Sequence, residues 1–131
     1  MSSPWIEGLR SVALDVPDLA QAEAFYTRTW HLDVAHRATG ALYLHGTGSD
    51  HHLLALHAGG PAPAIRQVTL RARDRAALDA VAAAAVAAGA RVLEPIGPLA
   101  DDPAGGTGLR LRDPHGRIFQ VVHGDVRRDD D

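Results

Sequence analysis

The amino-acid sequence predicts an α+β fold made of two tandem copies of one βαβββ unit. The chain repeats itself, because residues 10–14 (Arg-Ser-Val-Ala-Leu) align with residues 66–70 (Arg-Gln-Val-Thr-Leu) at an offset of 66 − 10 = 56 residues. In each copy, alternating apolar residues are followed by apolar residues at helical spacing and then by three short β-type segments. A repeat of about 50 residues that occurs twice indicates a duplicated supersecondary unit.

The first predicted unit covers residues 8–58. Residues 9–16 alternate, with Val12, Leu14 and Val16 on one face, which predicts a half-buried strand. Asp18 is a suitable cap for the next helix, whose apolar positions recur from Leu19 to Trp30. Glycine-containing turns then separate three short predicted strands, over 32–36, 41–45 and 51–57.

The second predicted unit covers residues 64–123 and repeats this order. A strand over 65–72 leads to Asp74, which caps a helix over 75–88, and Gly89 fits the left-handed position that ends it. Three strands follow, over 91–94, 109–112 and 118–122. The Pro- and Gly-rich residues 95–108 predict a mobile loop, and the charged residues 124–131 predict a tail or linker.

Composition excludes several classes of function. The net charge is only −3 and the arginines are spread along the chain, which argues against nucleic-acid binding. The chain has no cysteine, so disulfides and thiolate chemistry are excluded. No apolar run reaches about 18 residues and no signal-peptide pattern is seen, so we expect a soluble, cytoplasmic protein with no membrane span.

The element order and one turn motif carry a family resemblance. Asp113-Pro114-His115-Gly116 precedes the closing strand. With this motif, residues 8–123 resemble the vicinal oxygen chelate superfamily, which includes glyoxalase I, bleomycin-resistance proteins and extradiol ring-cleavage dioxygenases. The resemblance implies a cupped mixed sheet with helices outside. It also implies a cleft whose metal ligands come from the first strand of each unit and from the last strand of the second.

Carried over to this chain, the family's metal positions fall on Ser11, Gln67 and Gln120, with Leu54 at a further carboxylate position. These uncharged side chains imply a weak divalent site, because a catalytic Fe(II) site needs imidazoles and a carboxylate. We therefore predict no metal cofactor. Ser11, Gln67, Thr69 and Gln120 instead suit a small polar or aromatic ligand. In the alternative, the cup is filled by its own side chains and both glutamines bond within the sheet.

Histidines offer a second set of candidates, since the chain has eight. Strand alternation predicts that His52 faces inward with Leu54, where it is a candidate ligand contact and general base, while His51 points the opposite way. The alternative is an ordinary histidine at a strand end.

Three functional classes remain open. Because it lacks the family's metal ligands, the chain resembles the N-terminal, metal-free domain of two-domain extradiol dioxygenases. This resemblance implies a small-molecule-binding or scaffold domain. An active extradiol dioxygenase or glyoxalase-like lyase is the second class, and it would need Fe, Mn, Zn or Ni. A drug-sequestering resistance protein is the third. Edge strands in such folds pair, so we expect a homodimer or a following catalytic domain.

Overall fold

The computed structural model describes residues 4–128 and contains eight strands, two α-helices and one π-helical segment. In chain order the elements are β1 (Ile6–Val16), α1 (Leu19–Ala24), η1 (Phe25–Thr29), β2 (Asp33–Ala38), β3 (Ala41–His45), β4 (Leu54–Ala58), β5 (Ala64–Ala72), α2 (Arg75–Ala87), β6 (Arg91–Pro98), β7 (Thr107–Arg112) and β8 (Ile118–His123). This order confirms the predicted α+β fold with two βαβββ copies.

The chain divides into two compact units, which we name by position. The N-terminal unit holds residues 11–66 and 127–128, and the C-terminal unit holds residues 4–10 and 67–126. These units differ from the sequence repeats at their ends, because the start of β1 groups with the C-terminal unit and the last described residues group with the N-terminal unit.

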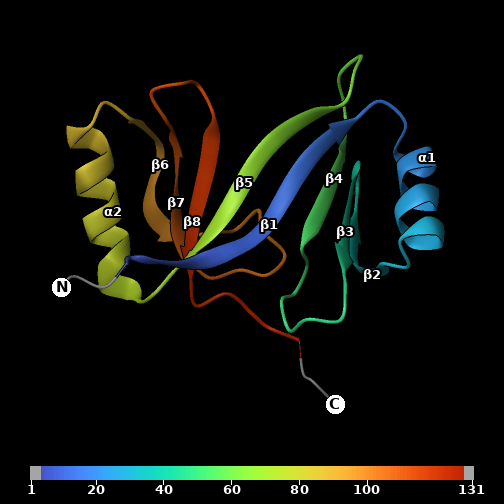
Figure 1. Ribbon diagram of the computed structural model, residues 1–131, viewed down its shortest axis with the longest axis horizontal. Helices are drawn as coiled ribbons and strands as arrows, with labels where there is room; N and C mark the ends of the chain where they lie inside the picture. Colours follow the sequence, from blue (N-terminus) through green and yellow to red (C-terminus); the bar gives the residue numbers. More distant parts are fainter. Residues whose placement is uncertain (1–3, 129–131) are drawn as a thin grey trace. The chain divides into compact units, whose positions relative to one another are not determined.

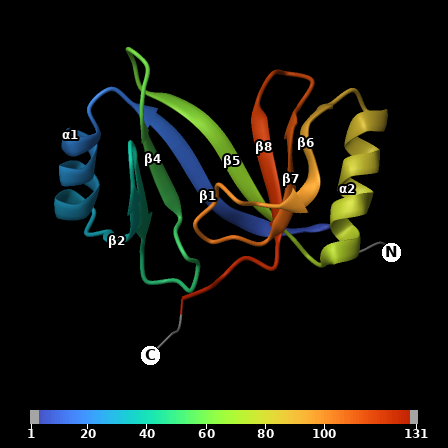
Figure 2. The same cartoon turned by 180° about the vertical axis from the view of Figure 1, so that it is seen from behind.

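The N-terminal unit has the strand order β2-β3-β4-β1. The β1–β4 pair is parallel and the other two pairs are antiparallel, so the sheet is mixed as predicted. Figures 1 and 2 show α1 alongside β2, β3 and β4 from both sides. Leu19, Ala22 and Tyr26 from this helical segment pack on a leucine-rich strand cluster whose buried members are Val16, Leu42, Leu44, Leu54 and Leu56.

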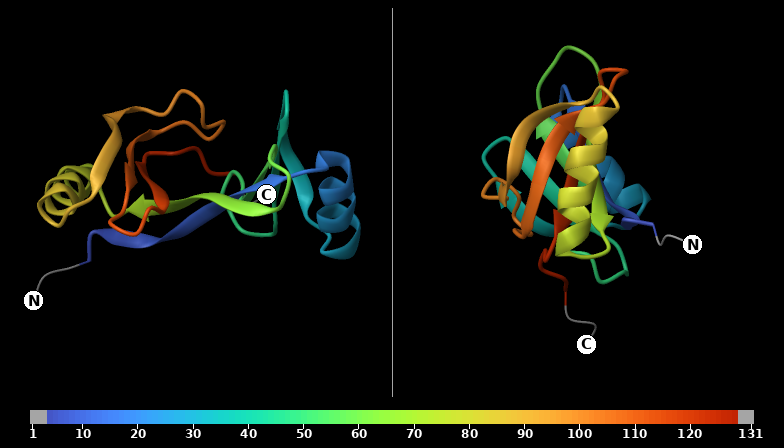
Figure 3. Two further views of the ribbon diagram at one scale, coloured as in Figure 1. Left: turned by 90° about the horizontal axis from the view of Figure 1, so that it is seen from above. Right: turned by 90° about the vertical axis from the view of Figure 1, so that its left-hand side faces the viewer.

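The C-terminal unit has the order β5-β8-β7-β6, again with one parallel pair, β5–β8. Helix α2 lies along one side of these strands (Figure 3), and its Leu78 is fully buried against Leu109 and Val121. Asp74 caps the helix by accepting a 2.8 Å hydrogen bond from the Ala77 N–H. Gly89 follows with φ of 100°, as predicted for the end of this helix.

Three local predictions need correction. The helix predicted from Leu19 to Trp30 is a six-residue α-helix followed by a π-helix. The strand predicted over 51–57 begins only at Leu54, since a bend precedes it. The loop predicted over 95–108 is shorter, because β6 runs to Pro98 through two irregularities in its pairing with β7.

The remaining loop residues, 99–106, are held by hydrogen bonds rather than left open. Leu99 donates its N–H to the Gly106 carbonyl at 3.0 Å, and both Leu99 and Ala104 are buried. The described part of the charged tail is also bonded, since the Arg128 N–H donates to the Ser49 carbonyl at 2.7 Å. Within residues 4–128, no helix is long and apolar enough to span a membrane.

Candidate functional site

Gln120 and Thr69, both predicted site residues, are buried partners in the C-terminal unit. They face each other in the parallel β5–β8 pair and are 5% and 3% exposed. The Nε2 atom of Gln120 donates to Oδ2 of Asp102 at 3.0 Å and to Oγ1 of Thr69 at 3.4 Å. The amide of Gln120 is therefore bonded within its own unit.

Asp102 belongs to a buried network of two arginines and two aspartates. The Nη2 atom of Arg10 lies 2.7 Å from Oδ2 of Asp102, and Nη1 of Arg10 lies 3.7 Å from Oδ2 of Asp125. Arg71 holds Asp125 with two hydrogen bonds, of 3.1 Å from Nε and 2.6 Å from Nη2. The two positive and two negative charges balance, which is what a water-poor interior requires.

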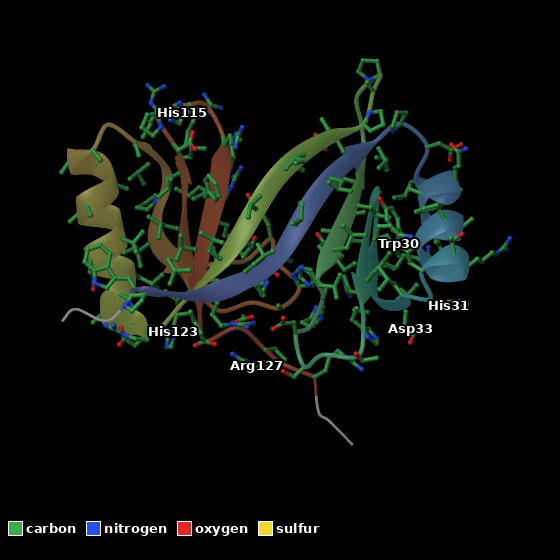
Figure 4. The ribbon with its side chains drawn as sticks, in the orientation of Figure 1. Trp30, His31, Asp33, His115, His123 and Arg127 are labelled. Carbon is green, nitrogen blue, oxygen red and sulfur yellow. The ribbon has the colours of Figure 1, made fainter. Side chains whose placement is uncertain are left out.

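Backbone hydrogen bonds of the 99–106 loop help to fix the positions of Asp102 and Asp125. The N–H of Val126 donates to the Ala104 carbonyl at 2.8 Å, which fixes the segment after β8 against this loop. Asp102 itself accepts from the Ala104 N–H at 2.9 Å. Figure 4 labels His123 and Arg127, and Asp125 lies between them in the chain.

The surroundings of Asp125 keep it ionised. Burial by itself raises the pKa of this carboxyl, but the hydrogen bonds from Arg71 and the charges of Arg71 and Arg10 outweigh burial, so the pKa lies below its usual value. The network is therefore held together by charge at neutral pH.

Gln67, the third predicted residue of this unit, is also bonded. Its Oε1 atom accepts a 2.9 Å hydrogen bond from Nε of Arg110, whose Nη1 binds Glu94. Its Nε2 atom lies 3.5 Å from Oγ1 of Thr69. The amide oxygen of Gln67 thus faces a guanidinium cation.

In the N-terminal unit, Ser11 is buried, but Leu54 lies on the other face of the sheet from the one predicted. Leu54 belongs to the cluster under α1, whereas Ala55 packs with Ala13, Ala41 and Tyr43. Ala13 pairs with Ala55 as Thr69 pairs with Gln120. Since 13 + 56 = 69, the counterpart of Gln120 is Ala55, and the inward placement of Leu54 is wrong by one residue.

His52 lies in the bend before β4, 2% exposed, with its ring 4.9 Å from that of Tyr43. Its Nδ1 atom is 2.9 Å from Nδ1 of His51, so the two rings meet rather than point apart as predicted. The strand alternation used for that prediction does not apply in a bend. The rings of His36 and His57 also lie near Tyr43, with centroids 5.8 and 6.0 Å from the centroid of its ring.

Within residues 4–128, no three His, Cys, Asp or Glu side chains gather in an arrangement that could hold a metal ion. Sequence reasoning missed Arg10, Tyr43, Asp102 and Asp125 as site residues. Of these four residues, only Arg10 carried a signal in the sequence, because it begins the repeated segment that aligns with residues 66–70. Asp102 and Asp125 come from a loop and from the segment after the last strand, where no periodicity exists to place them.

Comparisons with known proteins agree with this architecture. The glyoxalase-like domain family matches residues 11–122. The Mn(II)-bound glyoxalase from Novosphingobium aromaticivorans is 27% identical, with a TM-score of 0.90 over 97% of this chain and 42% of that chain. A variant of homoprotocatechuate 2,3-dioxygenase from B. fuscum, in complex with HPCA, is 25% identical, with a TM-score of 0.85 over 97% of this chain and 35% of that chain.

Homoprotocatechuate 2,3-dioxygenase from Arthrobacter globiformis, at 24% identity and a TM-score of 0.85, shows the same fold over 97% of this chain and 39% of that chain. No curated protein sequence gives a significant match. This chain thus spans 35% to 42% of the length of these three structures. By the family match and these neighbours, the chain belongs to the glyoxalase-like domain family of the vicinal oxygen chelate superfamily.

Proposed function

We propose that this chain is a glyoxalase-like domain, related to extradiol ring-cleavage dioxygenases, that has lost the metal ligands and binds a small aromatic molecule. The observation that carries the loss of the metal ligands is the bonding of Gln120, and the rings around Tyr43 support the aromatic ligand. At the position where the family places a metal ligand, this side chain donates its amide to Asp102 and Thr69.

The donor set around Gln67 and Gln120 does not fit a divalent cation. Both side chains are neutral, and Gln67 already turns its oxygen to Arg110. Arg10 and Arg71, both buried, add two positive charges that Asp102 and Asp125 balance. A dication placed here would find no net negative charge to hold it, because the two guanidinium groups already neutralise the two carboxylates.

The rings around Tyr43 support an aromatic ligand in the N-terminal unit. Tyr43 is edge-on to His52 and His57, and the neighbouring residues Ala13 and Ala55 are small. Offset and edge-to-face contacts between such rings and a planar ligand are favourable by about 1 kcal/mol each. Histidine rings add hydrogen-bonding nitrogens that suit a phenolic hydroxyl group.

Metal analysis and titration with catechol test this proposal together. We expect elemental analysis of the purified protein to give Fe, Mn, Zn and Ni well below one equivalent per chain. We also expect calorimetry in EDTA to detect catechol binding that Tyr43→Leu weakens about tenfold, the loss of about one ring contact. A stoichiometric metal that Gln67→Ala and Gln120→Ala both remove would contradict the metal-free reading.

Two further measurements on the same protein separate the other two functional classes. Ring cleavage or lyase turnover by the metal-loaded protein would identify an active enzyme. Binding of planar antibiotics in preference to catechol would identify a sequestering protein. We further propose that the domain acts beside a catalytic domain or as a homodimer, which the mass of the natural protein in solution, measured by light scattering, will decide.

A further inference from the structure

We propose that the N-terminal unit binds a second kind of ligand, a small aromatic amine, in an open pocket of about 680 Å³ next to α1. The pocket is formed by the end of β1, the α1–η1 segment and the start of β5. Its volume lies within the range of roughly 300 to 1,000 Å³ that is usual for small-molecule sites. The ligand site proposed above involves the opposite face of the sheet, on which Ala13 and Tyr43 lie.

The wall of the pocket is apolar and partly aromatic. Leu14, Val16, Ala22 and Tyr26 line it and also belong to or pack against the leucine-rich cluster under α1, so the wall is anchored in the core. Phe25 joins them and is 46% exposed, unusually open for a phenylalanine. An apolar ligand would cover this surface, and the removal of the apolar surface from water would favour binding.

The internal repeat explains why this space is open. In the C-terminal unit, Ile6 at the start of β1 packs against the core beneath α2. Its counterpart in the other copy is 6 + 56 = 62, which is the small residue Ala62. The start of β5 next to it contributes only Pro63, Ala64 and Ile65 to the pocket, and Ile65 is 71% exposed. The α1 copy therefore has an alanine where the α2 copy has an isoleucine packed against its core.

The π-helix contributes the aromatic side of the pocket. Helix α1 changes to π-helical hydrogen bonding at Phe25, and η1 runs to Thr29. Phe25, Tyr26 and Trp30 form a ring cluster, with centroids 5.0 to 5.5 Å apart. Short π-helical segments within α-helices are frequent at functional sites.

The charges around the pocket select a cation. Among the described residues, the charged members of the lining are the two carboxylates Asp15 and Asp18. Arg66 lies outside the lining and pairs with Asp15 at 2.8 Å. The sum over these three groups is one negative charge, so an ammonium group on an aromatic ligand is attracted and a carboxylate is repelled. The aromatic rings add cation–π attraction.

Three probes that share a phenethyl group and differ in the charge of the attached group test this inference: phenethylamine, phenethyl alcohol and hydrocinnamate. Trp30 reports on binding, because its ring contacts those of Phe25 and Tyr26 (Figure 4 labels Trp30), and Trp5→Phe removes the other tryptophan signal. We expect phenethylamine to change Trp30 emission with an affinity about tenfold above that of hydrocinnamate and with the alcohol between them. Equal affinities, or no binding at millimolar concentration, would overturn the proposal.

Two variants locate the binding. Asp18→Asn removes a charge but keeps a residue that caps α1, and we expect it to weaken phenethylamine about threefold to fivefold. Asp79→Asn, on the exposed surface of α2, is the matched control and should leave the affinity unchanged. Ala64→Phe fills the pocket and should abolish binding, with an unchanged circular dichroism spectrum as the control for folding.

A second copy of the chain is the competing occupant. Sedimentation of the wild-type protein and of Ile65→Asp distinguishes the two cases. If the wild type is a dimer that Ile65→Asp dissociates, and phenethylamine does not bind, the pocket is a dimer interface and the proposal fails. Catechol binding that depends on Tyr43 would be unaffected by that result, so the two proposals fail separately.

Discussion

The Nε2 atom of Gln120 lies 3.0 Å from Oδ2 of Asp102, the same oxygen that Nη2 of Arg10 approaches at 2.7 Å. Gln120 thus donates to a carboxylate that already has a cationic partner. The amide adds a hydrogen bond without adding charge, which leaves Arg10, Arg71, Asp102 and Asp125 in balance. A glutamate at this position would upset that balance.

We therefore expect Gln120→Glu to destabilise the fold at neutral pH. The new carboxylate would replace a donor with an acceptor about 3 Å from Asp102, in a site that is 5% exposed. Repulsion between buried like charges should lower the free energy of unfolding by about 3 kcal/mol, measured by urea denaturation. The loss should shrink as the pH is lowered, because protonation removes the repulsion.

The same substitution at Gln67 is the matched control. Gln67 accepts a hydrogen bond from Arg110, so Gln67→Glu creates an ion pair at a partly exposed site. Its stability should stay within about 1 kcal/mol of the wild type. If Gln120→Glu is as stable as Gln67→Glu, the polar network around Gln120 is not as the structure describes it.

Asp125→Asn should be among the most destabilising single substitutions in the chain. It removes the charge that receives both hydrogen bonds from Arg71 and leaves a buried guanidinium without its counter-charge. Breaking a buried pair in this way lowers stability by about 3 to 5 kcal/mol. Asp79→Asn breaks an exposed pair with Arg75 and should change the thermal midpoint very little, since such pairs contribute about 0.5 kcal/mol or less.

Stability should fall as the solution becomes mildly acidic, and His57 should account for part of the change. Burial, together with the charge of Arg66, holds the pKa of His57 below its usual value of 6.5. The unfolded chain then takes up the proton first, so the free energy of unfolding decreases as the pH falls below about 6.5.

His57→Gln should flatten this dependence between about pH 7 and 5, as measured by urea denaturation at each pH. His115→Gln, in an exposed turn, is the control for replacing a histidine by glutamine. An identical slope in His57→Gln would remove His57 as the cause. At lower pH the loss continues, because Arg71 and Arg10 hold the pKa of Asp125 below 3.8 against burial, and protonation ends both ion pairs.

The fold follows from local patterns that the sequence displays directly. The alternation of Leu14 and Val16 and the capping residues Asp18 and Asp74 predict β1, α1 and α2, and the structure confirms these elements. The site is less predictable, because a shift of one residue reverses the face of a strand. The assignment of Leu54 failed for this reason, and the parallel register of Ala13 with Ala55 corrects it.

The contacts of Gln120 lay outside any local pattern. Asp102 is 18 residues away in the chain and lies in a loop, so its approach depends on how that loop folds back. The loop in turn depends on Gly106 and Gly108, since a Cβ at Gly106 would lie 2.9 Å from the His123 carbonyl oxygen. Such requirements of close packing become visible only in three dimensions.

Gly108→Ala provides a direct test of that close packing. A Cβ at this buried position would overlap the carbonyl oxygen of Val121 in β8 and lie 3.1 Å from Cδ1 of Leu99. The overlap involves backbone, so β7 and β8 must separate, and the free energy of unfolding should fall by about 2 to 3 kcal/mol. Because β8 carries Gln120 and the loop carries Asp102, the pH dependence of stability should change as well.

Gly8→Ala is the matched control, also on a strand that contributes to the C-terminal unit. No described atom lies within 4 Å of a Cβ built at Gly8, and its φ is outside the left-handed region. Alanine there should be neutral or stabilise the protein by about 0.5 kcal/mol, because it restricts the unfolded chain. Equal stability of the two variants in urea denaturation would mean that β7 and β8 are not packed as closely as Gly108 indicates.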